Sequence, residues 1–402
     1  MRSDFALVRA CDIVSGKSTE ILFLPISMFR YFVFLFCCLV VVPSYAQEQS
    51  PMAGFGIEAN ALGGKVIKHT RKFTAPIPPF SSAFDVNFIW QTYGKKDWQQ
   101  RRRFPLIGVG VTYTDYGSNQ IFGNCIGIYP NLQVPLIRGK NLEWTLRFGD
   151  GLGYVTRKYQ ATAPVDTLNN AIGSHLNDFA VFMTDVRYHV NEHWQVQVGA
   201  NFTHISDADY HQPNLGVNMG GLHVGVQYFP VTNRPTRIIK DLPKLSNRWL
   251  FEFRYGMSFK EARAPKTGDP TAPAYIGTAY ISRRWLGKNK MFAGVDYAYH
   301  KDVYDFLVNY GVDYGHEKNH SWDGAFFVGN EFLEGRVGLV TQLGVYYHQT
   351  FLKFDPFYEK IGVNFYLIKT EHGALKELFL SAMLLTHEIT AEYAEFGIGA
   401  GF

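Results

Sequence analysis

The sequence predicts an all-β protein, an antiparallel transmembrane β-barrel with eight strands in its first half and about eight more in a duplicated second half. Bulky apolar and polar residues alternate through many short segments. A strand-like segment also reaches the last residue, Phe402. Beyond an N-terminal leader, no stretch approaches the roughly 20 apolar residues of a membrane helix. A secreted chain with these properties is either a soluble β-protein or an outer-membrane barrel.

The alternating segments favour the barrel. In each of them one face carries large apolar or aromatic side chains, and the other carries polar, charged or glycine residues. A soluble sandwich would bury the bulky face, whereas a membrane barrel turns it toward lipid and keeps a polar interior. Aromatic residues make up 16% of the chain, which suits the interfaces of such a barrel. The clearest segments are 84–90, 107–113, 142–148, 249–255 and 361–367.

The N-terminal region is expected to be a leader and not part of the fold. Arg30 precedes an apolar run from Phe32 to Val42, and Ser44-Tyr45-Ala46 supplies a small-x-small cleavage site. This order is typical of a secretory signal peptide, and Met28 is the expected true start. Residues 1–46 are therefore interpreted as an upstream extension and signal peptide, with a single-pass anchor as the alternative.

One cysteine, Cys125, lies beyond the leader. A single cysteine forms no internal disulfide, so the stability of the fold must come from strand pairing and packing.

The mature chain divides into two halves joined by a proline-containing linker. Residues 47–229 are expected to form the first barrel half, 230–247 the linker, and 248–402 a second, degenerate half. The segment at Thr386-His387 echoes Thr203-His204, but Ile389 stands where the first half has Ser206. The second half is therefore predicted to lack a nucleophile. The sequence leaves open one sixteen-stranded barrel or two eight-stranded barrels.

Loop lengths predict the orientation of the strands. Short connections such as 138–141 and 191–193 alternate with long ones such as 64–82, 155–174 and 207–217. In outer-membrane barrels short turns face the periplasm and long loops face outward. Residues 204–218 are thus predicted to lie at the outer rim, level with the outer leaflet of the bacterial outer membrane.

The candidate site lies on the seventh and eighth predicted strands. The apolar series of residues 194–202 continues at the same parity into His204 and Ser206. Alternate residues of a strand share a face, so His204 and Ser206 should face lipid together. Asn218 opens the next strand at the same rim. Polar groups are costly on a lipid-facing surface and usually indicate function.

These residue types suit nucleophilic catalysis. Serine needs a base to take its proton, and a third polar group should orient the histidine. Ser206 would be the nucleophile, His204 the base and Asn218 the orienting group, with the backbone amides of Asp207 and Ala208 as oxyanion donors. Strand rise places residues i and i+2 roughly 7 Å apart, so twist or a bulge is expected to close the gap. The alternative is that His-x-Ser merely ends a strand at a polar rim.

The stretches Thr203 to Ala208 and Gln212 to Asn218 resemble the lipid A 3-O-deacylase (PagL-type) family. This resemblance implies an eight-stranded outer-membrane barrel that removes an ester-linked acyl chain from lipid A, with His204 as base and Ser206 as nucleophile. The sequence departs from the family in two places. Asp207 stands where the family has Asn, and Asn218 where the family has its triad Glu.

The sequence thus predicts an outer-membrane serine esterase whose partners are lipid A of lipopolysaccharide and the surrounding lipid. No cofactor is expected, and no nucleic-acid partner, since the basic run Arg101 to Arg103 suits a solvated turn. Asp207 and Asp209 offer too few carboxylates for a calcium site. The rival hypothesis is a non-catalytic pore or structural barrel with a decayed site. The sequence does not decide which ester is cut, the role of the second half or the oligomeric state.

Overall fold

The computed structural model describes residues 52–232, 234–261, 271–353, 355–387 and 390–402. Two sequence predictions lie outside these ranges. One is the leader, residues 1–46, and the other is Ile389, which the sequence aligns with Ser206. Among the described residues, no helix is both long and apolar enough to cross a membrane.

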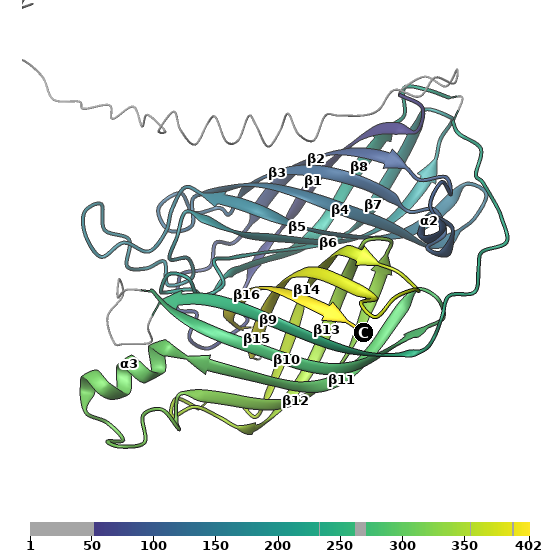
Figure 1. Cartoon of the computed structure of the whole chain (residues 1–402). Coiled ribbons are helices and arrows are strands. Elements are labelled where there is room, and N and C mark those ends of the chain that lie inside the picture. Colours follow the sequence, from purple (N-terminus) through teal and green to yellow (C-terminus); the bar gives the residue numbers. More distant parts are fainter. Residues whose placement is uncertain (1–51, 233, 262–270, 354, 388–389) are drawn as a thin grey trace, which may run out of the picture. The chain divides into compact units, whose positions relative to one another are not determined.

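The first eight strands close into one antiparallel barrel (Figure 1). Closure occurs because β8 pairs back with β1, from Ile57 opposite Tyr228 to Ile67 opposite Asn218. The strands are β1 (Phe55–Ile67), β2 (Ser81–Gln91), β3 (Leu106–Asp115), β4 (Asn124–Arg138), β5 (Leu142–Val155), β6 (Leu176–His189), β7 (Trp194–Ser206) and β8 (Val217–Tyr228).

The remaining eight strands close into a second barrel, in which β16 pairs back with β9. This closure decides the question that the sequence left open, in favour of two eight-stranded barrels. The strands are β9 (Trp249–Glu261), β10 (Thr271–Trp285), β11 (Asn289–His300), β12 (Trp322–Glu334), β13 (Val337–His348), β14 (Phe357–Lys369), β15 (Glu377–His387) and β16 (Thr390–Gly401).

Two helices were not expected from the sequence. Helix α2 (Asp97–Arg101) lies in the β2–β3 connection, and α3 (Lys301–Tyr310) follows β11. The β2–β3 connection therefore departs from the predicted pattern of short turns on that side, although the connections after β4 and β6 are short as predicted.

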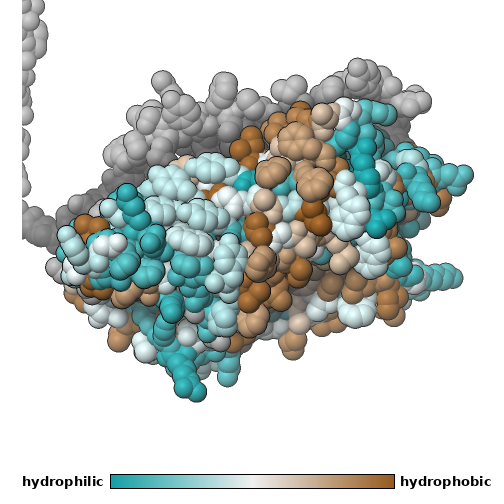
Figure 2. Space-filling view, turned by 60° about the horizontal axis from the view of Figure 1, so that its bottom comes forward, coloured by the Kyte–Doolittle hydropathy of each residue, from teal (hydrophilic) through white to brown (hydrophobic). Residues whose placement is uncertain are grey.

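The predicted division of faces is confirmed. On β7 the Val198 side chain is 54% exposed, while its neighbour Gln197 is 5% exposed. Figure 2 shows hydrophobic side chains gathered across the middle of one face and hydrophilic ones toward both ends. A barrel of this kind meets lipid with its apolar band and water with its rims.

Away from the long loops, the interior of the first barrel is charged, as predicted. Arg147 is fully buried and forms ion pairs with Glu58 and Asp85, with 2.9 Å between its Nη1 and Asp85 Oδ1. His223 Nε2 lies 2.6 Å from Asp185 Oδ1. Buried charges are tolerated only when they are paired, so these contacts complement one another inside the barrel.

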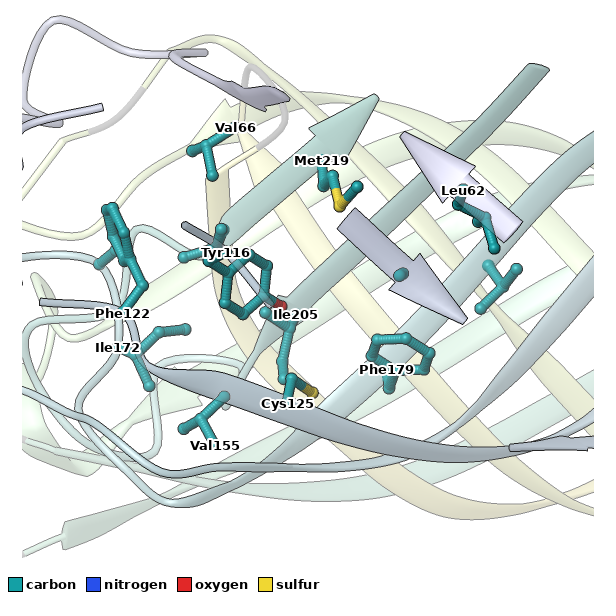
Figure 3. Packing of buried hydrophobic residues seen from close by; sticks show 14 of the residues in the cluster. Leu62, Val66, Tyr116, Phe122, Cys125, Val155, Ile172, Phe179, Ile205 and Met219 are labelled. Carbon is teal, nitrogen blue, oxygen red and sulfur yellow. The ribbon is translucent and has the colours of Figure 1, made fainter. Parts of the chain in front are cut away.

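The half of the same interior that lies nearest the long loops differs from the polar lumen that the sequence predicted. Ile205, Val217 and Met219 of β7 and β8 join an apolar cluster with Cys125, Phe179 and loop side chains (Figure 3). This apolar plug fills the barrel beneath the predicted site. It forms because the inward-facing residues of these strands near the long loops, among them Ile205, Val217 and Met219, are apolar.

Candidate active site

Strands β7 and β8 place the three predicted catalytic side chains next to one another. His204 lies directly opposite Asn218 in the β7–β8 register. Ile205, between His204 and Ser206, is fully buried in the apolar plug. Because neighbouring side chains of a strand point to opposite faces, anchoring Ile205 inside fixes His204 and Ser206 on the outer face.

The three side chains form a hydrogen-bonded chain. His204 Nδ1 lies 2.5 Å from Asn218 Oδ1, and His204 Nε2 lies 3.0 Å from Ser206 Oγ. An amide oxygen only accepts, so Nδ1 carries the proton and donates to Asn218. Nε2 is then free to accept the Ser206 hydroxyl proton. This is the protonation pattern that a histidine general base requires.

The gap between His204 and Ser206 is closed by the side chains and not by the backbone. β7 pairs with β6 and β8 without a register shift. Of the two expected ways of closing the gap, a bulge is therefore absent from the pairing of β7. The imidazole ring spans the strand rise between residues i and i+2, so a regular strand suffices.

The site is covered, which the sequence did not indicate. The Ser206 side chain is 1% exposed and Asn218 is 3% exposed. Gly216, in the loop between β7 and β8, packs closely over both partners. A Cβ built on Gly216 would lie 2.7 Å from His204 Cε1 and 3.3 Å from Ser206 Cβ.

Neighbouring loops hold this cover in place. The Gly216 amide donates to the Ala171 carbonyl at 2.9 Å, and His69 Nε2 lies 2.8 Å from the Leu215 carbonyl. The Asp207 amide donates to Asn214 Oδ1 at 3.2 Å. Residues 214–216 belong to the motif identified in the sequence. The motif did not indicate, however, that the backbone at Gly216 would lie against the side chains of His204 and Ser206.

Asp207 organises the same loop. Its Oδ2 accepts the backbone amide of His211 at 3.2 Å. Burial raises the pKa of the Asp207 carboxyl to about 7, although hydrogen bonds from backbone amides act in the opposite direction. Asp207 follows the last residue of β7, so it lies in the loop and not in the spanning strand.

The echo in the second barrel does not reproduce the site. His387 faces the lumen, where its Nδ1 lies 3.3 Å from Glu392 Oε2 and its Nε2 lies 3.1 Å from the Tyr346 hydroxyl. His204, by contrast, has the parity of the outer face. The alignment of the two histidines is therefore not a structural equivalence, because sequence similarity of a few residues does not fix strand parity.

Within the described ranges, no group of three or more His, Cys, Asp or Glu side chains could hold a metal ion. The constellation that remains is a serine, a histidine and an amide.

Comparisons with known proteins agree with this architecture. Residues 82–227 match the family model of lipid A 3-O-deacylase (PagL), and residues 249–402 match that of the acyloxyacyl hydrolase C-terminal domain. No curated protein sequence matches the chain.

Similar solved structures include neisserial surface protein A, with 14% identity and a TM-score of 0.31, covering 44% of this chain and 97% of that one. The outer membrane enzyme PagL has 17% identity and a TM-score of 0.29, covering 42% and 97%. Both barrels thus match families of hydrolases. The resemblance to the lipid A 3-O-deacylase family is confirmed, and it lies in the first barrel.

Proposed function

We propose that the first barrel is an outer-membrane serine esterase that hydrolyses an ester-linked acyl chain of lipid A. The main support for this proposal is the continuous series of hydrogen bonds from Ser206 Oγ through the His204 ring to Asn218 Oδ1. It occurs on an outward-facing surface, where polar groups are costly without a function. The match of residues 82–227 to the lipid A 3-O-deacylase model supports the substrate class.

The proposed reaction has two steps. Ser206 Oγ attacks the ester carbonyl carbon while His204 Nε2 takes the hydroxyl proton. Collapse of the tetrahedral intermediate breaks the bond to the sugar oxygen, which leaves with the proton from His204. Water then attacks the acyl-serine with His204 again as base, and the fatty acid is released. Asn218 keeps the imidazole in the required tautomer throughout.

The oxyanion donor is best assigned to Ala208. The Asp207 amide, the other candidate, already donates to Asn214 Oδ1. Ala208, the next residue, has a left-handed backbone conformation with a φ of 55°. This conformation turns the chain away from the direction of the strand. A backbone amide directed at the developing negative charge stabilises it without reorganisation.

Substrate access requires the cover to move. Since Ser206 is 1% exposed, an ester carbonyl reaches Oγ only when residues 214–216 are displaced. Lipid A would approach laterally from the outer leaflet, and water would enter from the rim.

The decisive experiment compares the mass spectrum of lipid A from cells that produce the wild-type chain, the Ser206→Ala variant or neither. We expect loss of one acyl chain with the wild type alone, and a fall in esterase rate of about 10³-fold or more in the variant. Heat-modifiable gel mobility checks that the variant barrel assembles. Unmodified lipid A in wild-type cells would favour the rival, a non-catalytic barrel with a decayed site.

A single sixteen-stranded barrel with a polar lumen would favour the pore version of that rival. Both barrels here have eight strands, and a barrel of eight strands is just wide enough for side chains to fill. In the second barrel Lys290 Nζ lies 3.1 Å from Glu252, 3.0 Å from Glu331 and 2.9 Å from Glu377.

A further inference from the structure

The first barrel contains a cavity at the end opposite to Ser206. Its volume is about 210 Å³. The residues that line it come from the turn-side ends of strands β2 to β8, among them Arg138 at the end of β4 and Gln195 at the start of β7. The segment after β8 closes one side, with Phe229, Arg234 and Arg237 in the lining. We name this space the turn-side cavity.

The lining of the turn-side cavity is strongly cationic. Its only carboxylate among the described residues is Glu143, and Arg138 already donates to that group at 3.0 Å. The cationic side chains are Arg138, Lys140, Arg187, Arg234 and Arg237, with His189 beside them. Lysine and arginine therefore outnumber acids by five to one around this space.

Deeper in the barrel charges are balanced, so the imbalance is local to the cavity. Arg187, at the inner end of the cavity, donates to Gln197 Oε1 and Gln133 Oε1, both at 2.9 Å. Its Nη2 also lies 3.9 Å from Glu58 Oε2 and 4.0 Å from Asp185 Oδ2. Arg234 donates to the Glu192 carbonyl, and the Glu192 carboxylate also acts on it. In the described part of the chain, Arg237 and Lys140 have no carboxylate within ion-pair distance, although the Glu143 carboxylate acts on Arg237 from farther away.

Two of these arginines are held in a way that leaves them available. The Arg234 guanidinium lies 4.4 Å from the centre of the Phe229 ring, and that of Arg237 lies 5.2 Å from the centre of the Phe104 ring. Stacking uses the face of a guanidinium and leaves the N–H groups at its edge able to form hydrogen bonds, apart from the Arg234 Nη2 group that donates to the Glu192 carbonyl. Partial desolvation lowers the pKa of Arg237 and the neighbouring charge of Arg138 lowers it further, while the Glu143 carboxylate acts in the opposite direction.

We propose that the turn-side cavity is a binding site for a phosphate group. Planar guanidinium forks match phosphate oxygens, and a dianion would neutralise the excess charge. Drug-sized ligands occupy about 300–1,000 Å³, so this smaller cavity suits a phosphate or a phosphorylated headgroup. Because turns of outer-membrane barrels face the periplasm, the phosphate comes either from a free periplasmic anion or from a phospholipid of the inner leaflet.

The test is isothermal titration calorimetry of the full chain refolded in detergent. Inorganic pyrophosphate is the first probe, and bicelles of phosphatidylglycerol against phosphatidylcholine are the second. We expect saturable binding by the wild type and a Kd at least about tenfold higher in Arg237→Gln, the loss of one charge-assisted contact. Binding of pyrophosphate alone assigns a free anion, and preference for phosphatidylglycerol assigns a headgroup.

The matched control is Arg71→Gln, which removes one exposed positive charge from the loop after β1, at the opposite end of the barrel. Its Kd should equal that of the wild type, and the esterase rate of Arg237→Gln should be unchanged. The proposal is overturned if neither probe binds saturably, or if Arg237→Gln and Arg71→Gln bind alike.

Discussion

At the scale of single residues, Asn218 is one of the two positions where the sequence departs from the family that it resembles. The 2.5 Å contact with His204 Nδ1 gives the imidazole an orienting partner without a negative charge. An amide fixes the tautomer but stabilises the imidazolium less than a carboxylate does. The hydrogen-bonded arrangement is thus that of a triad, with an amide in place of the carboxylate.

This difference predicts the behaviour of two variants. Asn218→Ala should lower the turnover rate on the order of 100-fold with little change in KM, because the imidazole loses its orientation. Asn218→Glu should hold or raise the rate and make it more sensitive to acid, since a carboxylate can be protonated. Esterase kinetics across pH measure both effects. An alanine variant as active as the wild type would remove Asn218 from the mechanism.

Asp207 gives a second residue-scale prediction, in pH dependence. Its pKa rises from 3.8 to about 7, so between these values the folded protein holds a proton that the unfolded chain has lost. Stability therefore falls as pH rises from about 4 to 7 and remains at the lower level above that. Asp207→Asn, which cannot ionise, should show a smaller fall in Tm between pH 5 and pH 8.

The comparison is internal, because all other titrating groups are the same in both proteins. The asparagine oxygen can still accept the His211 amide, so the loop and the esterase activity should persist. Equal changes of Tm with pH in the two proteins would show that Asp207 is ionised throughout.

At the scale of elements, the β7–β8 loop lies over the candidate site. Gly216 has a φ of 71° and leaves no room for a Cβ beside His204. Its backbone position is set by the neighbouring loop through the Ala171 carbonyl. The loop therefore limits where the imidazole can lie, and in the proposed mechanism its displacement would expose the serine.

Gly216→Ala should consequently damage activity more than assembly. The left-handed conformation costs a non-glycine residue about 1–2 kcal/mol, and the added methyl would push the His204 ring away from Ser206. A displacement of about 1 Å can cost on the order of 100-fold in rate. Esterase assays with heat-modifiable mobility as the control check this. Wild-type rates in a folded variant would mean that the ring is not confined by the loop.

At the scale of the whole molecule, the two barrels carry their own strand pairing. Every strand from β1 to β8 pairs within the first barrel, and every strand from β9 to β16 within the second. Each has buried ion pairs inside and an apolar surface outside. We propose that the division at the linker, residues 230–247, is also a division of folding units.

A chain that ends at residue 247 should therefore refold alone. In detergent it is expected to show heat-modifiable mobility and to retain esterase activity, because the proposed catalytic chain lies entirely within β7 and β8. Full-length His387→Ala is a further control and should be as active as the wild type. Failure of the shortened chain to close would show that the first barrel needs the second.

The sequence by itself determined the strands, their faces and the motif. Period-two alternation depends only on neighbouring residues, so Gln197 inside and Val198 outside could be predicted without knowing any partner strand. The parity of His204 and Ser206 followed from the same rule, and the quoted motif indicated the family.

Tertiary structure decided everything that depends on which strands meet. Alternation does not specify the strand on which a barrel closes, so only the β8–β1 and β16–β9 pairings separate two barrels from one. The cover of Gly216 over Ser206, the lumenal His387 and the unbalanced cations of the turn-side cavity arise from residues far apart in the chain. Such contacts are fixed by closure and loop packing, which no local pattern of residues encodes.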